Sequence, residues 1–303
     1  MDGARLLRDR ARAPPGRERA PVKFRTQARR LQRSNAAIWG VAYPRATRGR
    51  LGGGVRGSSD AMYPSGTRSG MATGARRHPN WMGTDVYCTI LAYRTDKFGA
   101  KGPQSWRDYF DTVKFPGRRA MRRSPIDTLE LALLAEGVAP AKLYPLDVDR
   151  AFKKLDQIKK SIAVWWTGGA QTSQLLQSGE VDMCPTWNAR AQTVIDANSP
   201  VKISWNQGLY SIEGWGIPKG NPKAAIGRRF VAFCANAKRQ AAFTEFLSYG
   251  PTNPNAYKYI KPEVAAKLPT APNIFPHIIL AKEEWWADNR QKAEERFTAW
   301  MLS

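Results

Sequence analysis

Histidine and cysteine are scarce in this chain, which has two histidines and three cysteines among 303 residues. Cys88, Cys184 and Cys234 are odd in number and have no CxxC spacing. They therefore indicate neither a disulfide framework nor a zinc site, and we expect buried free thiols. His78 and His277 stand alone, and no GxSxG, HExxH or GxGxxG motif occurs in the strand-and-helix context that such a motif needs. The sequence predicts no catalytic residue, no metal and no cofactor, and thus a binding protein rather than an enzyme.

Long apolar runs are also missing. No segment reaches the roughly 18 apolar residues that a helix needs to cross a membrane. The N-terminus is positively charged but lacks the apolar stretch of a signal peptide. Taken by themselves, these observations predict a chain that stays in the cytoplasm.

Negative charge is rare in residues 1–80, which hold 18 Lys and Arg against 4 Asp and Glu, whereas residues 81–303 hold 30 against 21. Of those 18 basic residues 17 are arginine, and the 11 glycines fall in no pattern with a period of 2 or 3.6. This composition predicts an atypical, disordered segment. An Arg/Gly-rich tail that binds nucleic acid is the functional alternative. Net charge describes non-specific association rather than one pocket, so we do not expect nucleic acid to be the partner.

From Trp81 onward, apolar strands alternate with capped helices. The expected strands are residues 86–93, 161–166, 181–187 and 202–206. The expected helices start near residues 105, 124, 148, 170 and 188, and Gly137 and Gly179 are expected to end two of them. Such alternation predicts an α/β protein with a mainly parallel sheet.

Two further helices are expected near the C-terminus. Asn221-Pro222 is typical of a helix start, and the spacing of Ile226, Phe230 and Phe233 predicts that these side chains face inward. Residues 282–301 place Trp286, Ala293, Phe297 and Trp300 on one stripe, which predicts core packing.

Residues 181–218 bring an indole and a carboxylate to neighbouring strand ends. A strand ends on Trp187, Asn188 opens the next helix, and the returning segment carries Glu213. Open α/β sheets bind small ligands at such strand ends. A carboxylate neutralises an ammonium group while an indole face covers its methylenes, each contact being worth on the order of 1 kcal/mol once desolvated. The pairing predicts capture of a small organic cation.

Structural roles compete with this interpretation. Trp187 could be a plain core aromatic residue. Asp127, with Glu130 three residues later, also fits a helix capping box. Glu213 is harder to explain structurally, because a lone acid between apolar strand residues is costly to bury without a cationic partner.

Four segments occur in the same order as in a known family: SWRDYFD…FPGRRA, TWNARA, GLYSIEGWGIPKG and YGPTNPNA. On these segments, residues 81–303 resemble the periplasmic polyamine-binding proteins of ABC importers, the spermidine/putrescine type. The resemblance implies an α/β, periplasmic-binding-protein-like fold with two lobes joined by crossing strands that close on the ligand. It also implies a monomeric periplasmic protein that delivers a polyamine, or a similar small organic cation, to the permease subunits of an ABC transporter.

The resemblance extends to individual residues. It implies that Trp187 lies along the methylene chain of the ligand and that Asn188 follows it in the site. It also implies that Glu213 binds one amino group and that Asp127, at a helix start in the other lobe, binds a second. Ser211 departs from the family pattern, because spermidine binders carry tryptophan there.

Residues 1–80 match nothing of the family's first lobe, so we expect that lobe to be incomplete. Residues 81–212 are expected to form mainly the second α/β lobe, residues 213–257 the return segment of the first lobe, and residues 258–303 C-terminal helices that pack on the second. Two alternatives stay open: a binder of another small amine or of an organic anion, and a nucleic-acid-binding protein that uses residues 1–80.

A basic cluster precedes the helix that contains Asp127. It consists of Lys114, Arg118, Arg119, Arg122 and Arg123. We interpret it as a solvated face, with contact to nucleic acid or to the transporter's membrane subunits as the alternative.

Overall fold

The described part of the chain begins at a short strand and is continuous from Trp81. The computed structural model describes residues 77–78 and 81–303, which all belong to one compact unit, Arg48–Ser303. The predictions made for residues 1–80 therefore fall almost wholly outside the described residues.

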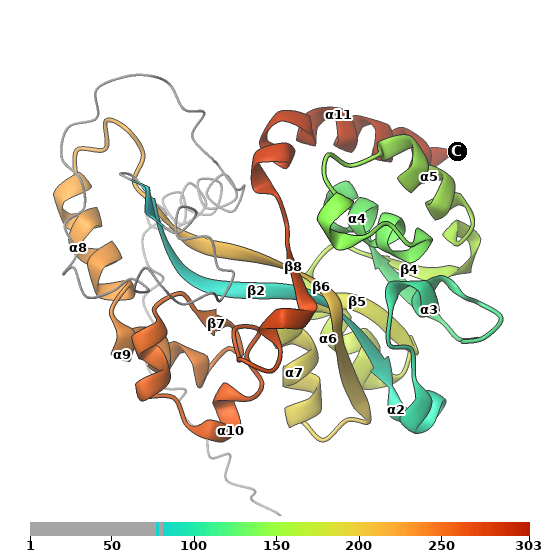
Figure 1. Cartoon of the computed structure of the whole chain (residues 1–303), viewed down its shortest axis with the longest axis horizontal. Coiled ribbons are helices and arrows are strands. Elements are labelled where there is room, and N and C mark those ends of the chain that lie inside the picture. Colours follow the sequence, from blue (N-terminus) through green and yellow to red (C-terminus); the bar gives the residue numbers. More distant parts are fainter. Residues whose placement is uncertain (1–76, 79–80) are drawn as a thin grey trace, which may run out of the picture. The chain divides into compact units, whose positions relative to one another are not determined.

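Strands and helices alternate through most of this part (Figure 1). The strands are β1 (Arg77–His78), β2 (Trp81–Arg94), β3 (Arg119–Arg122), β4 (Ile162–Trp166), β5 (Met183–Trp187), β6 (Val201–Gly216), β7 (Gly250–Pro251) and β8 (Ile278–Leu280). The helices are α2 (Thr95–Phe98), α3 (Trp106–Phe110), α4 (Pro125–Glu136), α5 (Val148–Asp156), α6 (Gly169–Ser178), α7 (Asn188–Asp196), α8 (Ala224–Cys234), α9 (Ala237–Thr244), α10 (Pro262–Ala265) and α11 (Glu283–Leu302). Short 3-10 turns lie at Gly99–Lys101, Pro140–Lys142, Lys159–Ser161, Pro254–Lys258 and Phe275–His277.

One mixed sheet joins these strands in the order β4-β3-β5-β2-β6-β8, and β1 and β7 also pair with β2. The pairs β3–β4, β3–β5 and β6–β8 are parallel, whereas β2 is antiparallel to β5 and β6. The prediction of a mainly parallel sheet is therefore wrong. Residues 201–216 form one continuous strand that runs back along β2, where the sequence suggested a short strand and a separate return segment.

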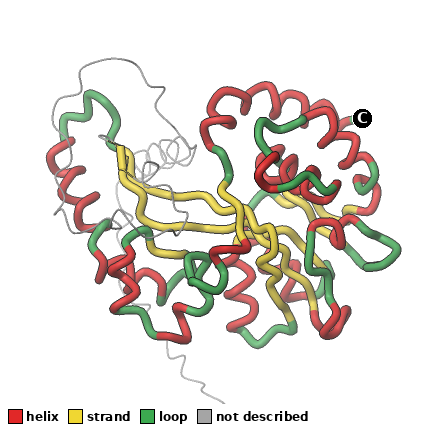
Figure 2. Tube along the Cα trace, viewed as in Figure 1, coloured by secondary structure: helices red, strands yellow, loops and turns green. Residues whose placement is uncertain are grey.

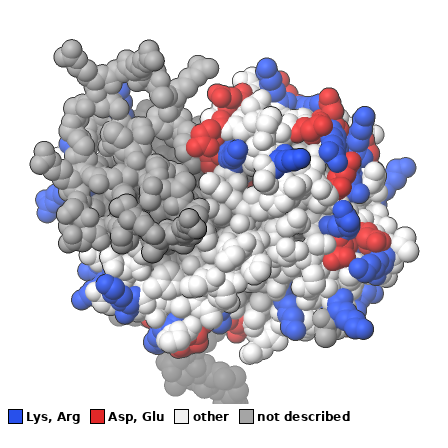
Figure 3. All heavy atoms as spheres, in the orientation of Figure 1, with Lys and Arg blue, Asp and Glu red and all other residues white. Residues whose placement is uncertain are grey.

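Helices cover both faces of the sheet (Figure 2). Leu91 and Tyr93 of β2 pack in a cluster with α3, α4, α5 and α11, whereas Cys88 and Ile90 pack in a second cluster with α6 and α7. Alternation along the strand explains this division, because successive side chains point to opposite faces. Acidic and basic side chains gather on the outer surfaces of the helices, around α11 in the view of Figure 3.

Local capping signals are confirmed. Ser105 accepts a hydrogen bond from the Asp108 amide at the start of α3, and Ser124 accepts one from the Ile126 amide at the start of α4. Gly137 and Gly179 end α4 and α6 with positive φ angles of 96° and 72°, a conformation that glycine adopts without penalty.

Helix α8 contradicts its predicted orientation. Ile226, Phe230 and Phe233 are 65%, 48% and 52% exposed, although all three were expected to face inward. Helical spacing shows which residues share a face but not what covers that face. In α11, by contrast, Trp286, Ala293 and Phe297 are buried as predicted.

Candidate functional site

Trp187 ends β5 and lies among aromatic side chains at the point where α7 begins. Its ring centroid is 6.3 Å from that of Tyr87 and 5.8 Å from that of Trp166, both in edge-on contact. A Cβ atom at Gly169, the first residue of α6, would stand 2.7 Å from the Trp187 ring, so only glycine fits there. The indole N–H of Trp187 is buried and has no hydrogen-bond partner among the described residues.

Arg122 places a positive charge on this aromatic group. Its guanidinium carbon lies 5.4 Å from the Trp187 centroid and 5.8 Å from the Trp166 centroid. The Arg122 Nη1 donates to Asp127 Oδ2 at 2.7 Å, and the Thr89 hydroxyl donates to the same oxygen at 3.1 Å. The guanidinium makes no other hydrogen bond to the described residues, so Nε and Nη2 remain available to an anionic group.

Asp127 is held in an uncommon backbone conformation. Its φ is 67° and its ψ is −47°, inside the first turn of α4. Ser124, not Asp127, caps the helix, so the capping-box interpretation of Asp127 is wrong. A non-glycine residue with positive φ is rare and costs on the order of 1–3 kcal/mol, and such strain concentrates at functional sites. What the conformation achieves here is contact of the carboxylate with both Arg122 and Thr89.

The basic cluster is not a uniformly solvated face. Arg119 is 1% exposed, and its guanidinium donates to the backbone carbonyls of Tyr109 and Gly117 at 2.8 and 2.7 Å. Arg122 points to the aromatic group, and only Lys114, Arg118 and Arg123 of the cluster are exposed. The solvated-face interpretation is therefore wrong for the two arginines that lie within β3, a strand whose residues are buried or partly buried on both faces.

Asn188 is fully buried. Its side-chain oxygen accepts from the Cys88 amide at 3.0 Å, and its amide nitrogen donates to the Ser248 carbonyl at 2.6 Å. These bonds tie α7 to β2 and to the segment before β7. Asn188 thus holds together the elements that surround Trp187, and its predicted contact with a ligand stays a prediction.

Glu213 lies opposite another acid. Asp85 and Glu213 are register partners on β2 and β6. Burial, followed by the charge of Glu213, raises the pKa of Asp85 to about 7, and desolvation also raises the pKa of Glu213. Asp85 Oδ1 is buried without a partner among the described residues. Burial is thus the leading cause of both shifts, and the charge of Glu213 adds to the shift of Asp85.

Glu213 and Trp187 lie beside different positions of β2. Glu213 pairs with Asp85 and Trp187 with Thr89, four residues further along β2. At about 3.3 Å per residue, this spacing corresponds to about 13 Å. Tyr87 lies between these two positions on β2, and its ring is 6.1 Å from that of Tyr249. Burial raises the pKa of Tyr249, and the charge of Glu213 raises it further. Glu213 and Trp187, on which the predicted site rested, are therefore connected through the aromatic side chains of Tyr87 and Tyr249 and not by direct contact.

Tyr87 and Glu283 are candidate site residues that the sequence reasoning missed. Tyr87 is the register partner of Ser211, and its pKa is raised well above the usual range by burial and then by the charges of Asp127 and Glu283. Alternation within the predicted strand 86–93 could have separated Tyr87 from the core residues Val86 and Cys88. No local signal marks Glu283, which reaches the site only through the packing of α11.

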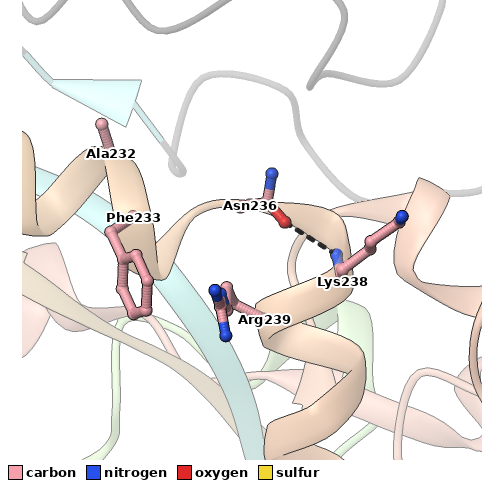
Figure 4. A pocket seen from close by; sticks show the side chains of 5 residues that line it. All are labelled: Ala232, Phe233, Asn236, Lys238 and Arg239. Carbon is pink, nitrogen blue, oxygen red and sulfur yellow. Dashed lines mark hydrogen bonds between the residues drawn. The ribbon is translucent and has the colours of Figure 1, made fainter.

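A separate pocket of about 550 Å³ lies at the turn between α8 and α9. Its lining residues are Ala232, Phe233, Asn236, Lys238 and Arg239 (Figure 4). The Arg239 guanidinium lies 4.5 Å from the Phe233 centroid, and the Asn236 side chain accepts from the Lys238 amide at 3.0 Å. None of the predicted ligand-binding residues lines this pocket.

Metal-binding clusters and membrane-spanning helices are both absent from the described residues. Over residues 77–78 and 81–303, His, Cys, Asp and Glu form no group of three or more that could hold a metal ion. No helix in the same part of the chain combines the length and apolar composition required to cross a membrane.

Comparison with known proteins defines the class to which this fold and site belong. Residues 60–273 match the family described as bacterial extracellular solute-binding protein. The chain belongs to this family, and it has the periplasmic-binding-protein fold with a mixed α/β sheet. The family consists of solute-binding transport components rather than enzymes. Its match begins at residue 60, inside the stretch that the sequence set apart as atypical.

Three members of the comparison show how similar this chain is to individual proteins. The gamma-aminobutyric acid-binding protein of Pseudomonas aeruginosa is 37% identical over 222 residues, which are 72% of this chain and 62% of that protein. The chain thus spans about 62% of the length of this curated relative. A solved ABC transporter substrate-binding protein from Bradyrhizobium japonicum is 44% identical with a TM-score of 0.72, covering 75% of this chain and 72% of that one. The PBP MotA of A. tumefaciens B6, solved with glucopine, is 29% identical with a TM-score of 0.71, covering 80% and 77%.

Proposed function

We propose that this chain is the ligand-binding component of an ABC importer, and that it binds a small organic amine that also carries a carboxylate. The observation that carries the proposal is the Arg122 guanidinium, which faces Trp187 and Trp166 and is tethered by Asp127. Guanidinium nitrogens in a fixed fork suit a carboxylate, and the aromatic rings suit the aliphatic part of a ligand.

The ligands of the relatives support this class. Gamma-aminobutyric acid contains one amino group and one carboxylate. The relative from Pseudomonas aeruginosa is named as a gamma-aminobutyric acid-binding protein. The chain resembles that protein over less than two thirds of its length, so ligand, permease partner and periplasmic location are all part of the proposal. A polyamine, the ligand implied by the spermidine/putrescine resemblance, contains only positive groups and has nothing to offer Arg122. A polyamine is therefore the alternative ligand against which the proposal is tested.

Isothermal titration of the full chain tests the proposal. Gamma-aminobutyric acid and putrescine are titrated into the unsubstituted protein, into Arg122→Gln and into Arg123→Gln. Arg123 is the exposed neighbour of Arg122 and provides the matched control. Loss of one partner of a desolvated charge pair costs about 2 kcal/mol or more, so Arg122→Gln is expected to weaken binding of the amino acid by roughly 30-fold. Arg123→Gln is expected to change it less than about twofold.

Two results would contradict the proposal. If putrescine binds and gamma-aminobutyric acid does not, the polyamine interpretation replaces it. If both arginine variants behave alike, Arg122 is not the carboxylate partner. Circular dichroism of each variant excludes unfolding as the cause of lost binding.

A further inference from the structure

Glu283 enters the site from the C-terminal helix. The strand before it, β8, is parallel to β6, with Leu280 beside Tyr210, and the Ala281 amide donates to the Tyr210 carbonyl at 2.9 Å. The chain then leaves the sheet and begins α11 at Glu283. The next residue of β6 is Ser211, whose side chain partly offsets the rise that burial causes in the pKa of Glu283.

A second contact fixes this end of α11 to the helix that contains Asp127. Trp286, three residues after Glu283, is 4% exposed, and its indole N–H donates to Glu130 Oε1 at 2.6 Å. Glu130 follows Asp127 by three residues in α4. The position of Glu283 relative to Asp127 is therefore set by two contacts, one through the sheet and one through α4.

Glu283 lacks the cationic partner that Asp127 has. Asp127 forms an ion pair with Arg122, whereas Glu283 forms no ion pair with any residue that the structure describes. Burial raises the pKa of Glu283, the Ser211 side chain lowers it in part, and the charge of Asp127 raises it further. A positive group placed beside Glu283 would remove the repulsion between these two carboxylates.

We infer that Glu283 receives the amino group of the ligand while Arg122 receives its carboxylate, an inference that rests on the proposed function. Tyr87 connects the two groups, because it is the register partner of Ser211 and its ring lies 6.3 Å from that of Trp187. Glu213, which the sequence favoured for the amino group, faces Asp85 instead. The separation of Glu283 from Arg122 would then select ligands by the number of carbons between amine and carboxylate.

Glu284, in the same helical turn, is a matched control that distinguishes a structural role of Glu283 from a ligand-binding role. Acidic residues in a first helical turn interact favourably with the helix dipole. Glu284 shares the first turn of α11 with Glu283 but is exposed, whereas Glu283 is partly buried. A helix-dipole role would therefore make the two glutamates equivalent, whereas a ligand role would not.

The experiment is isothermal titration of the full chain with gamma-aminobutyric acid and with butyrate, which has the same carboxylate and no amino group. The variants are Glu283→Gln, Glu283→Asp and Glu284→Gln. We expect Glu283→Gln to weaken binding of the amino acid about 30-fold and to leave butyrate binding within about twofold. Glu283→Asp, which retains the charge, should lose less than Glu283→Gln, and Glu284→Gln should match the unsubstituted protein.

The inference is overturned if Glu283→Gln binds the amino acid as tightly as the unsubstituted protein, or if Glu284→Gln loses as much. An equal loss of butyrate binding would also overturn it, since it would indicate a structural role. In these cases binding by the unsubstituted protein leaves the proposed function standing. If the unsubstituted protein binds neither gamma-aminobutyric acid nor putrescine, the proposed function fails and this inference fails with it.

Discussion

The two ends of the long β2–β6 pair differ in how their charges and apolar side chains are matched. At the end around Thr89, Asp127 meets Arg122 in an ion pair, and helices cover both faces of the sheet. At the end around Asp85, two carboxyl groups face each other. Beyond that end, Phe230 and Phe233 of α8 are exposed.

The difference separates the part of the site that folding itself stabilises from the part that it does not. An ion pair with hydrogen bonds from a strand and a helix stabilises the fold and orients Arg122 at once. Facing carboxyl groups are held together by the strand register, and the charge of Glu213 adds to the burial that raises the pKa of Asp85. Loss of the ion pair at the covered end should therefore lower stability, whereas loss of one facing carboxyl group at the other end should raise it.

The largest effect is expected at the covered end, for the buried acid Glu130. Burial, then the charge of Asp127, raises the pKa of Glu130 from 4.5 to about 8. The folded protein thus holds a proton that the unfolded chain releases, and stability falls as the pH rises from about 4.5 to about 8. Glu130→Gln should flatten this fall and unfold later in urea at pH 8.5, by up to a few kcal/mol. Glu136→Gln, at an exposed site in the same helix, should follow the unsubstituted protein; an identical profile for Glu130→Gln would show that burial does not hold its proton.

A smaller loss is expected for the ion pair of the same end. Asp127→Asn leaves Arg122 without its charged partner while keeping a residue that tolerates positive φ. We expect the free energy of unfolding in urea to fall by about 2 kcal/mol. If Asp127→Asn proves as stable as the unsubstituted protein, the pair has no structural weight and the contrast between the two ends disappears.

An opposite and smaller effect is expected at the Asp85 end. Glu213→Gln removes one of the facing carboxyl groups, so the pKa of Asp85 should fall from about 7 toward its ordinary range. Because Glu213 is exposed, the gain in stability should stay below about 1 kcal/mol. A titration of Asp85 by NMR checks the pKa, and a rise instead of a fall would show that the charge of Glu213 does not raise it.

The smallest effect is expected on α8. Ile226→Lys adds charge to a side chain that is 65% exposed, and it should change the free energy of unfolding by no more than about 0.5 kcal/mol. Binding of an apolar dye such as ANS should decrease. Phe297→Lys in the buried stripe of α11 is the contrasting variant and should prevent stable folding; a comparable loss for Ile226→Lys would mean that α8 is covered after all.

Local signals in the sequence predicted much of the fold. Ser105, Ser124, Gly137 and Gly179 act within one helical turn of themselves, and the helices that they bound were predicted close to their observed limits. Strand pairing depends on residues distant in sequence, so the antiparallel β2–β6 pair was not predicted. The same reason explains α8, because its apolar face is visible in the sequence but its covering is not.

The candidate site was predicted in part. Trp187 and Asp127 were chosen, and the structure connects them through Arg122, which a charge count had assigned to the surface. The choice of Arg122 required knowledge of which face of β3 it occupies. Glu283 could not be chosen at all, because its place depends on how α11 packs on α4 and β6.

The central claim is that the aromatic group around Trp187, with Arg122, binds the ligand. A crystal structure of the full chain grown with gamma-aminobutyric acid tests it most directly. The account predicts an ordered ligand whose carboxylate lies within hydrogen-bond distance of Arg122 and whose carbon chain lies against Trp187 and Tyr87. A ligand ordered elsewhere, such as in the pocket between α8 and α9, with the Arg122–Asp127 pair untouched, would contradict it.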